Sequence, residues 1–361
     1  MRLATVPESV VERVLLALGL VPTPSMDTMI ALLLARTIMS ATKLGLFEAL
    51  AHGPLAAAEV AARCGTDPRA TEKLLFALAG ARYVRAGAGK YALAPVARRW
   101  LLKDNPRSHR DAVLHRYLDA ALMEHAEEFV RTGRPANLHD GMCPEQWNLY
   151  QRGQRSYALY AAPEVARRTP VPRHPRTMLD IGGAHGYFSV ALCRRHPGLR
   201  SIVLDLPEAV EQSAPILARD GMGDRVAHRA GDALTDDLGV EQFDLIFLAN
   251  LVHHFDDPSN RDLMRRIARA LRPGGSCVIL EIIRSRSARA ASQIGALLDY
   301  YFAITSASGT WSFEEMADWQ RAAGLMAQRP IRLRFSPGYG LQAARKSGGV
   351  LRSLKGLFPG L

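Results

Sequence analysis

Cysteine and long apolar runs are both scarce in this 361-residue chain. The four cysteines are scattered without a Cys-x-x-Cys spacing, which argues against a disulfide framework and against a cysteine-based zinc site. The apolar run over residues 29–39 is too short to cross a bilayer, and residues 14–21 lack the basic start and small-residue cleavage site of a signal peptide. We therefore predict a cytoplasmic protein that needs no metal ion.

Acidic residues are missing from the C-terminal end. No Asp or Glu follows Asp318, and the eight Arg and Lys residues there account for +8 of the net charge of +11, which leaves +3 (11 − 8) for the rest of the chain. Within this part Arg332 and Arg334 alternate with apolar residues, as on a half-exposed strand at a sheet edge. Residues 347–361 mix basic and apolar residues with Gly and Pro, and we expect a flexible tail without membrane contact. This distribution does not indicate a nucleic-acid partner.

Residues 178–189 join a short apolar strand to a turn with the spacing Asp180-x-Gly182-x-x-x-Gly186. This is not the G-x-G-x-x-G turn of nicotinamide-binding folds. Glycine lets the backbone approach a ligand closely, and Asp180 places a carboxylate beside that ligand. A carboxylate there suits an ammonium group, which S-adenosylmethionine (SAM) carries. An ordinary tight turn is the alternative for the glycines alone.

Three further segments end in residues suited to the same ligand. Asp205 closes a β-branched run 23 positions after Gly182, where a carboxylate binds a ribose diol. Asp232 lies in a turn suited to the adenine edge, although Asp205 alone could be a helix cap and Asp232 alone a turn residue. Their joint occurrence at successive strand ends predicts a SAM site. The expected cofactor-binding residues are Asp180, Gly182, Gly186, Asp205, Leu206, Asp232, Ala233 and Asn250.

Strands and helices alternate through the second half of the chain. Strands are expected over 178–181, 201–205, 226–230, 243–250 and 277–281, with an amphipathic helix over 263–275 that ends at glycine. This rhythm predicts an α/β fold with a doubly wound, mostly parallel Rossmann-like sheet that binds its ligand at the C-terminal ends of the strands. Four prolines suggest that 163–177 is the linker into this domain.

The N-terminal part has a different pattern. Helices over 44–50, 57–65 and 67–78 precede a hairpin over 83–93, which predicts a winged helix. Such a domain could belong to a DNA-binding regulator that senses SAM. The presumed recognition helix offers only Arg69 and Lys73, so we favour a dimerisation domain and expect a second subunit to cover the apolar runs near the N-terminus. The predicted domains are 1–118 (winged helix), 119–162 (helical connection over the substrate), 163–346 (SAM-binding domain) and 347–361 (tail).

In these segments the chain resembles the class I SAM-dependent methyltransferases. More narrowly, it is similar to the dimeric caffeic-acid-type O-methyltransferases, which in bacteria modify polyketides and other secondary metabolites. The resemblance runs from about residue 27 to residue 346 and rests on Leu-Asp-Ile-Gly-Gly, Leu-Asp-Leu-Pro and Pro-Gly-Gly. It implies a homodimer, SAM bound by Gly182, Asp205 and Asp232, His253 as the general base, and Glu281 beside that base.

The chain departs from the family pattern at four positions. Ala184 replaces a third glycine, His254 replaces the Asp after the catalytic His, Ala249 replaces a lysine near the adenine, and Thr310 replaces a second catalytic Glu. The loss of a glutamate at Thr310 leaves open an alternative function, that of a C-methyltransferase acting on an enolisable carbon.

A phenol is a poor nucleophile until it loses its proton, and a neutral imidazole can take that proton at pH 7. His254 is the competing candidate for this role, and Asp299 lies on an aromatic-rich helix that can touch the acceptor. We predict a SAM-dependent O-methyltransferase for a small hydroxylated, aromatic or polyketide-type metabolite. The expected substrate residues are Trp147, Tyr150, Gln154, His254, Asp299 and Trp311, with Tyr301 and Phe302 as further aromatic walls.

Overall fold

The computed structural model describes residues 4–306 and 308–348, which divide into two compact units between Tyr117 and Leu118. This division lies one residue from the predicted boundary at 118/119. Most of the predicted tail lies outside the described residues. Nowhere in the described part of the chain is a helix both long enough and apolar enough to span a membrane.

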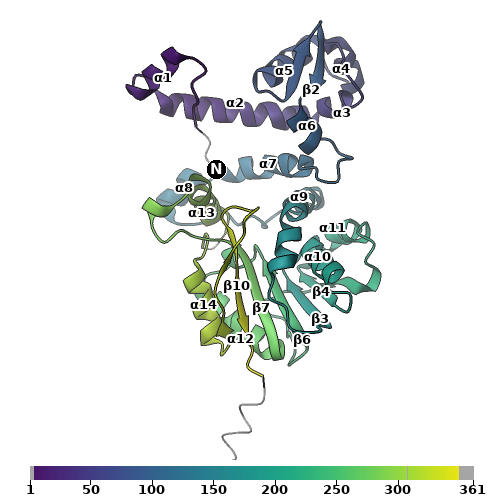
Figure 1. Ribbon diagram of the computed structural model, residues 1–361, viewed down its shortest axis with the longest axis vertical. Coiled ribbons are helices and arrows are strands. Elements are labelled where there is room, and N and C mark those ends of the chain that lie inside the picture. Colours follow the sequence, from purple (N-terminus) through teal and green to yellow (C-terminus); the bar gives the residue numbers. More distant parts are fainter. Residues whose placement is uncertain (1–3, 307, 349–361) are drawn as a thin grey trace, which may run out of the picture. The chain divides into compact units, whose positions relative to one another are not determined.

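The first unit contains the helices and hairpin expected of a winged helix (Figure 1). Asp67 caps the third of these helices by accepting a hydrogen bond from the Ala70 N–H at 2.7 Å, and Pro68 takes the first helical position, as predicted. No residue of the first helix of the chain is buried within this unit. The elements are α1 (Val10–Ala17), α2 (Thr23–Lys43), α3 (Leu46–Ala49), α4 (Ala57–Cys64), α5 (Pro68–Gly80), β1 (Val84–Gly87), β2 (Lys90–Leu93) and α6 (Pro95–Trp100).

The second unit is built on one eight-stranded sheet. The order β5-β4-β3-β6-β7 is parallel throughout, and β10 joins it antiparallel beside β7, followed by β8, with β9 also paired to β10. This topology confirms the predicted doubly wound, mostly parallel fold. The strands are β3 (Thr177–Ile181), β4 (Arg200–Asp205), β5 (Val226–Ala230), β6 (Phe243–Ala249), β7 (Leu271–Ile282), β8 (Met326–Ala327), β9 (Ile331–Arg332) and β10 (Tyr339–Arg345).

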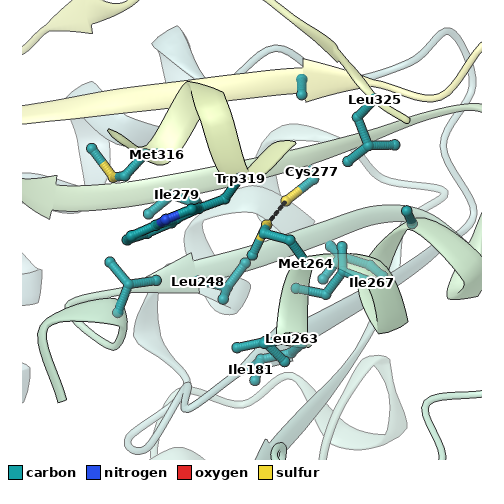
Figure 2. Close-up of a cluster of buried hydrophobic side chains, with 14 of the residues drawn as sticks. Ile181, Leu248, Leu263, Met264, Ile267, Cys277, Ile279, Met316, Trp319 and Leu325 are labelled. Atoms are coloured by element: carbon teal, nitrogen blue, oxygen red, sulfur yellow. Dashed lines mark hydrogen bonds between the residues drawn. The ribbon is translucent and has the colours of Figure 1, made fainter. Parts of the chain in front are cut away.

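Helices cover both faces of this sheet because alternate strand residues point to opposite sides. On one face, Phe247 of β6 packs with α9 (Pro144–Arg168), α10 (Tyr187–Arg195) and α11 (Pro207–Ala218). On the other, the neighbouring Leu248 packs with α12 (Asp257–Ala270) and α14 (Phe313–Ala322), around Trp319, Met316 and the Cys277–Met264 sulfur contact (Figure 2). The two hydrophobic cores, one on each face, therefore hold the parallel strands in place, with their carboxyl ends at one edge of the sheet.

Three predicted boundaries in this unit are wrong. The expected linker 163–177 is helical as far as Arg168, with Pro163 inside α9, because the apolar side of that helix is buried against the sheet and outweighs the cost of about 3 kcal/mol for an internal proline. The helix expected over 263–275 is α12, which begins at the Asp256 cap and ends at Ala270, where the chain already pairs as β7. The helical connection predicted to begin at residue 119 starts inside α7 (Arg110–Met123), which is followed by α8 (Ala126–Thr132). A further helix of this unit is α13 (Gln293–Thr305), and short 3-10 turns lie at η1 (Gly223–Arg225), η2 (Val252–His254) and η3 (Ala288–Ala290).

Candidate active site

The predicted polar residues meet at one edge of the sheet. Asp180 is the penultimate residue of β3, and Asp205 is the last residue of β4. Asp232 follows β5, Asn250 follows β6, and Glu281 lies near the end of β7. These strands are parallel neighbours, so their carboxyl ends lie side by side (Figure 1). Ligands of doubly wound sheets bind at this edge.

The turn after β3 requires glycine for packing. Gly182 has φ 65°, and a Cβ there would lie 2.6 Å from the Leu251 side chain. At Gly183, a Cβ would lie 2.6 Å from Cγ of Asp180 and 2.8 Å from Val203. Gly183 was not among the predicted site residues, although it keeps the Asp180 carboxylate in place. Gly186 begins α10 as its left-handed cap, with φ 70°.

Gly183→Ala is expected to destabilise the protein and to abolish detectable SAM affinity, because the new methyl group displaces Asp180. Thermal unfolding and calorimetric SAM titration measure both effects. Gly198→Ala is the matched control, since its Cβ would meet nothing closer than 3.5 Å. Normal SAM binding by Gly183→Ala contradicts this account of the turn.

Ala184, where the resembling family has glycine, adopts a left-handed conformation with φ 47°. Its N–H donates to Oδ2 of Asp205 at 2.7 Å, and Nε2 of His228 lies 2.8 Å from its carbonyl oxygen. These two contacts stabilise a backbone conformation that costs an alanine roughly 1–2 kcal/mol. The departure from glycine is therefore accommodated locally.

Asp180 carries a carboxylate oxygen that the described residues leave unsatisfied. The residue is 1% exposed, and its Oδ2 accepts from the Ser189 hydroxyl at 2.6 Å. Its Oδ1 is buried and has no hydrogen-bond partner among the described residues. Burial raises the pKa of this carboxyl to about 7, against the lowering effect of the Ser189 hydrogen bond. An orphaned buried oxygen of this kind fits the ammonium group of a cofactor.

Asp205 and Asp232 both hold the loops that follow their strands. Oδ1 of Asp205 accepts from the Leu206 N–H at 2.8 Å, and burial raises the pKa of the Asp205 carboxyl to about 6 against its backbone donors. Oδ1 of Asp232 accepts from the Leu234 N–H at 2.8 Å in a local turn. The predicted neighbours differ: Leu206 is exposed, whereas Ala233 packs against the core.

Asn250 adds a second unsatisfied oxygen at this edge. It is left-handed, with φ 53°, and its Oδ1 is buried without a hydrogen-bond partner among the described residues. Its N–H donates to the Leu280 carbonyl at 2.9 Å, which fixes the start of the loop that carries His253.

His253 and Glu281 form a buried pair. Nδ1 of His253 lies 3.0 Å and 3.1 Å from the two carboxylate oxygens of Glu281, and the two side chains are 3% and 0% exposed. The Ile282 N–H donates to Oε1 of Glu281 at 3.0 Å. A carboxylate accepts only, so the pair assigns the ring proton to Nδ1 and leaves Nε2 as a basic lone pair. This is the geometry of a general base held by an acid.

A continuous group of rings extends from His253. Phe302 stacks on His253 with ring centroids 3.9 Å apart, and His254 lies 4.3 Å from His253 on another side. His139 follows at 5.1 Å from His254 and stacks on Trp147 at 4.9 Å with an interplanar angle of 9°. We call Phe302, His253, His254, His139 and Trp147 the ring cluster.

Sequence reasoning missed His139, which lies in the loop between α8 and α9. No periodicity or motif marks this histidine, and only the fold brings it to His254. Burial lowers the pKa of His139 to about 4, with a further contribution from His253. Burial, with the imidazoles of His253 and His139, holds the pKa of His254 well below its usual range. Both rings are therefore neutral at pH 7.

Tyr150 connects the ring cluster to the cofactor side. Its ring lies 5.4 Å from that of His139, and Gln154 hydrogen-bonds to its hydroxyl. Burial and the nearby Asp205 carboxylate raise the pKa of Tyr150 above its usual range. The predicted substrate residues Trp147, Tyr150 and His254 thus come together, with Gln154 hydrogen-bonded to one of them.

Two predicted substrate residues have other roles. Trp311 belongs to the sheet core, where it meets Trp319 at 4.9 Å and donates its indole N–H to the Val252 carbonyl at 2.9 Å. It does not join the ring cluster, and its place among the substrate residues stays a prediction. Asp299 accepts hydrogen bonds at Oδ1 from the backbone N–H and the hydroxyl of Thr310.

A separate cavity of about 630 Å³ does not include any predicted site residue. Its lining contains four arginines, of which three already bind Glu164, Glu315 or Glu314. Across residues 4–306 and 308–348, no group of three or more His, Cys, Asp or Glu side chains is arranged to hold a metal ion.

Comparison with known proteins agrees with this geometry. A family model described as the O-methyltransferase domain matches residues 115–324, and a model of the O-methyltransferase dimerisation domain matches residues 26–103. The 3-hydroxy-5-methyl-1-naphthoate 3-O-methyltransferase of Streptomyces sahachiroi is 28% identical over 328 residues, covering 88% of this chain and 93% of that protein. The acetylserotonin O-methyltransferase of Bos taurus is 28% identical over 338 residues, covering 87% and 94%.

The fold also has solved counterparts. The crystal structure of human N-acetylserotonin methyltransferase in complex with SAM superposes with a TM-score of 0.81 at 19% identity, covering 95% of this chain and 99% of that one. The first family model spans more than half of the chain, so this protein belongs to the O-methyltransferase family. Membership confirms the prediction of a SAM-dependent O-methyltransferase with a dimerisation domain.

Proposed function

We propose that this enzyme methylates a hydroxyl group on a small, planar aromatic metabolite, with His253 as the general base. The buried His253–Glu281 pair inside the ring cluster is the observation that carries this proposal. A basic Nε2 surrounded by ring faces suits a phenol better than an aliphatic alcohol. The naphthoate in the name of one relative is a fused aromatic acid of this class.

The polar edge of the sheet supplies the cofactor contacts. SAM, when bound, supplies an electrophilic methyl group on a sulfonium. Asp180, through its unsatisfied Oδ1, would hold the ammonium group, and Asp205 would bind the ribose diol. Asp232 is assigned to the adenine edge, and Asn250 offers its buried Oδ1 at the same edge.

His253 performs the proton transfer. Nε2 of His253 would take the proton from the acceptor hydroxyl as the oxygen bonds to the methyl carbon and the methyl–sulfur bond of SAM breaks, with S-adenosylhomocysteine as the leaving group. The imidazolium that results keeps its Nδ1–H hydrogen-bonded to the Glu281 carboxylate. The buried carboxylate stabilises that imidazolium and fixes the plane of the ring, as the acid of a catalytic triad does. Phe302 closes one face of the imidazole against water.

The proposal is tested by incubating the purified full-length chain with methyl-¹³C-labelled SAM and a panel of naphthols, hydroxyaromatic acids and hydroxyindoles. A methoxy carbon in the product supports the proposal. Binding of SAM without methylation of any phenol or enol contradicts it and favours a SAM-binding protein with another role, for which salt-dependent DNA binding is the first check.

C-methylation is the second candidate. The position at which the resembling family carries a second glutamate is Thr310, and its hydroxyl is already bound to Asp299. An enolisable carbon needs proton removal from carbon, which the His253–Glu281 pair could also perform. A carbon-bound methyl signal in the same ¹³C spectrum would show that the enzyme methylates carbon and not oxygen.

Removing the Trp147 ring is expected to raise the acceptor KM about 2–10-fold with little change in kcat, since one ring contact contributes ~0.5–1.5 kcal/mol. His139→Ala should act in the same direction, because it removes the ring that stacks on Trp147. Steady-state kinetics on the best acceptor of the panel measures this. Phe335→Ala is the control, as Phe335 is an exposed aromatic residue outside the ring cluster. A fall in kcat alone contradicts an acceptor-binding role.

We further propose that the enzyme is a cytoplasmic homodimer. Apolar side chains of α1 and α2, such as Val10 and Leu32, are 74% and 65% exposed, and the dimerisation model covers residues 26–103. All four cysteines are free, which suits a reducing compartment. Sedimentation of the purified chain distinguishes the dimer from a monomer.

A further inference from the structure

Helix α13 contacts the His253 region in two ways. Phe302 stacks on the imidazole ring. Asp299, one turn earlier on the helix, accepts hydrogen bonds at Oδ1 from the Thr310 N–H at 2.8 Å and from the Thr310 hydroxyl. Thr310 is 1% exposed, so this bonding takes place away from water.

The segment around Thr310 in turn holds the backbone of the histidine loop. The Ser308 hydroxyl lies 3.2 Å from the His253 carbonyl oxygen and 3.0 Å from that of Phe255, and donates to one of them at a time. On the other side of Thr310, the Trp311 indole N–H donates to the Val252 carbonyl. Residues 308–311 therefore bind the loop on both sides of the imidazole.

We propose that Asp299, acting through Thr310, is a positioning residue that holds the His253 loop so that the imidazole meets both Glu281 and the acceptor. The proposal rests on the proposed function of His253. Its physical basis is that one partly buried carboxylate fixes two donors of the buried Thr310, and thereby fixes the flanking Ser308 and Trp311 donors. The carboxylate does not need its charge for this, only an acceptor oxygen at Oδ1.

The test follows the Nδ1 proton of His253 by NMR in ¹⁵N-histidine-labelled, full-length, ligand-free protein, with His253→Asn used to assign the signal. Asp299→Leu removes the acceptor oxygen, and we expect exchange of this proton with water to accelerate at least about tenfold, the scale of one lost hydrogen bond. Asp299→Asn keeps an acceptor oxygen and should restore slow exchange. Thr310→Val removes only the hydroxyl and should give an intermediate rate.

Leu192→Ala, in the core on α10, is the control for a general loosening of the fold. Its exchange rate is compared with that of Asp299→Leu at a matched loss of thermal stability. Unchanged exchange in Asp299→Leu, or equal acceleration in Leu192→Ala, overturns the proposal. If Asp299→Leu does not fold, Thr310→Val decides by the same measurement. The proposed base is tested separately by the turnover of His253→Asn, so fast exchange in Asp299→Leu together with a normal rate in His253→Asn would refute the base and leave the loop contact standing.

Discussion

Replacing His253 by asparagine is expected to lower kcat by about 10²–10⁴-fold, the usual contribution of a positioned general base. The affinity for SAM should not change, because His253 lies on the acceptor side of the site with Phe302 and His254 against its ring. Asparagine fills part of the space and can still donate to Glu281, so the loss reports proton transfer rather than collapse of the site. Single-turnover kinetics and calorimetric SAM titration measure the two quantities.

The rate loss of His253→Asn should also depend on the acidity of the acceptor phenol, which provides a second test of the same role. A phenol that is already ionised at the assay pH needs no base, so the deficit of His253→Asn should shrink as the acceptor becomes more acidic. His174→Asn is the matched control: His174 is exposed and left-handed, with φ 54°, a conformation that asparagine tolerates. A wild-type rate in His253→Asn with a weakly acidic phenol would remove the role assigned to the imidazole.

The polar edge of the sheet was predictable because each of its residues has a local mark in the sequence. Asp180 and Asp205 follow short apolar runs, and the turn after β3 carries glycines that its backbone conformation demands. Parallel strands carry such marks to the same edge without any further information. The order of the segments along the chain was therefore sufficient to predict that these residues meet at one edge of the sheet.

The ring cluster could be predicted only in part, because its contacts join loops that are distant in sequence. His139 stands 115 positions (254 − 139) before its neighbour His254, and no pattern relates them. Trp311 shows the converse difficulty, since an aromatic residue near a site is also a good core residue and the sequence does not distinguish the two. Asp299 was recognised as important, but its partner Thr310 depends on how the chain packs after α13.

Replacing Asp180 by asparagine is expected to weaken binding of S-adenosylhomocysteine, which has the same ammonium group as SAM, by about 10–100-fold, the scale of a charged hydrogen bond. In the wild-type protein the affinity should fall as the pH drops below about 7, since the Asp180 carboxyl has a pKa of about 7 and must lose its proton to face an ammonium. Asp205, with its pKa of about 6, adds a second proton below that pH. Calorimetry between pH 5.5 and 8.5, a window of roughly three units around these values, in two buffers of different ionisation heat should show proton release on binding.

The raised pKa of Asp180 also determines how the folding stability of the protein changes with pH. An unfolded Asp has a pKa of about 3.9, so between roughly pH 4 and 7 the folded, ligand-free protein keeps a proton on Asp180 that the unfolded chain has lost. The ionisation of Asp180 therefore lowers stability progressively from about pH 4, and the full cost is present once the pH has risen through about 7. Asp180→Asn removes that cost, so the variant should unfold at a higher temperature than the wild type at pH 8 while binding the cofactor worse. Asp237→Asn, an exposed carboxylate on the same domain, should change neither quantity. Affinity that is constant across the pH range, or an Asp180→Asn variant that loses stability at pH 8, would show that the buried carboxylate serves the fold and not the ammonium.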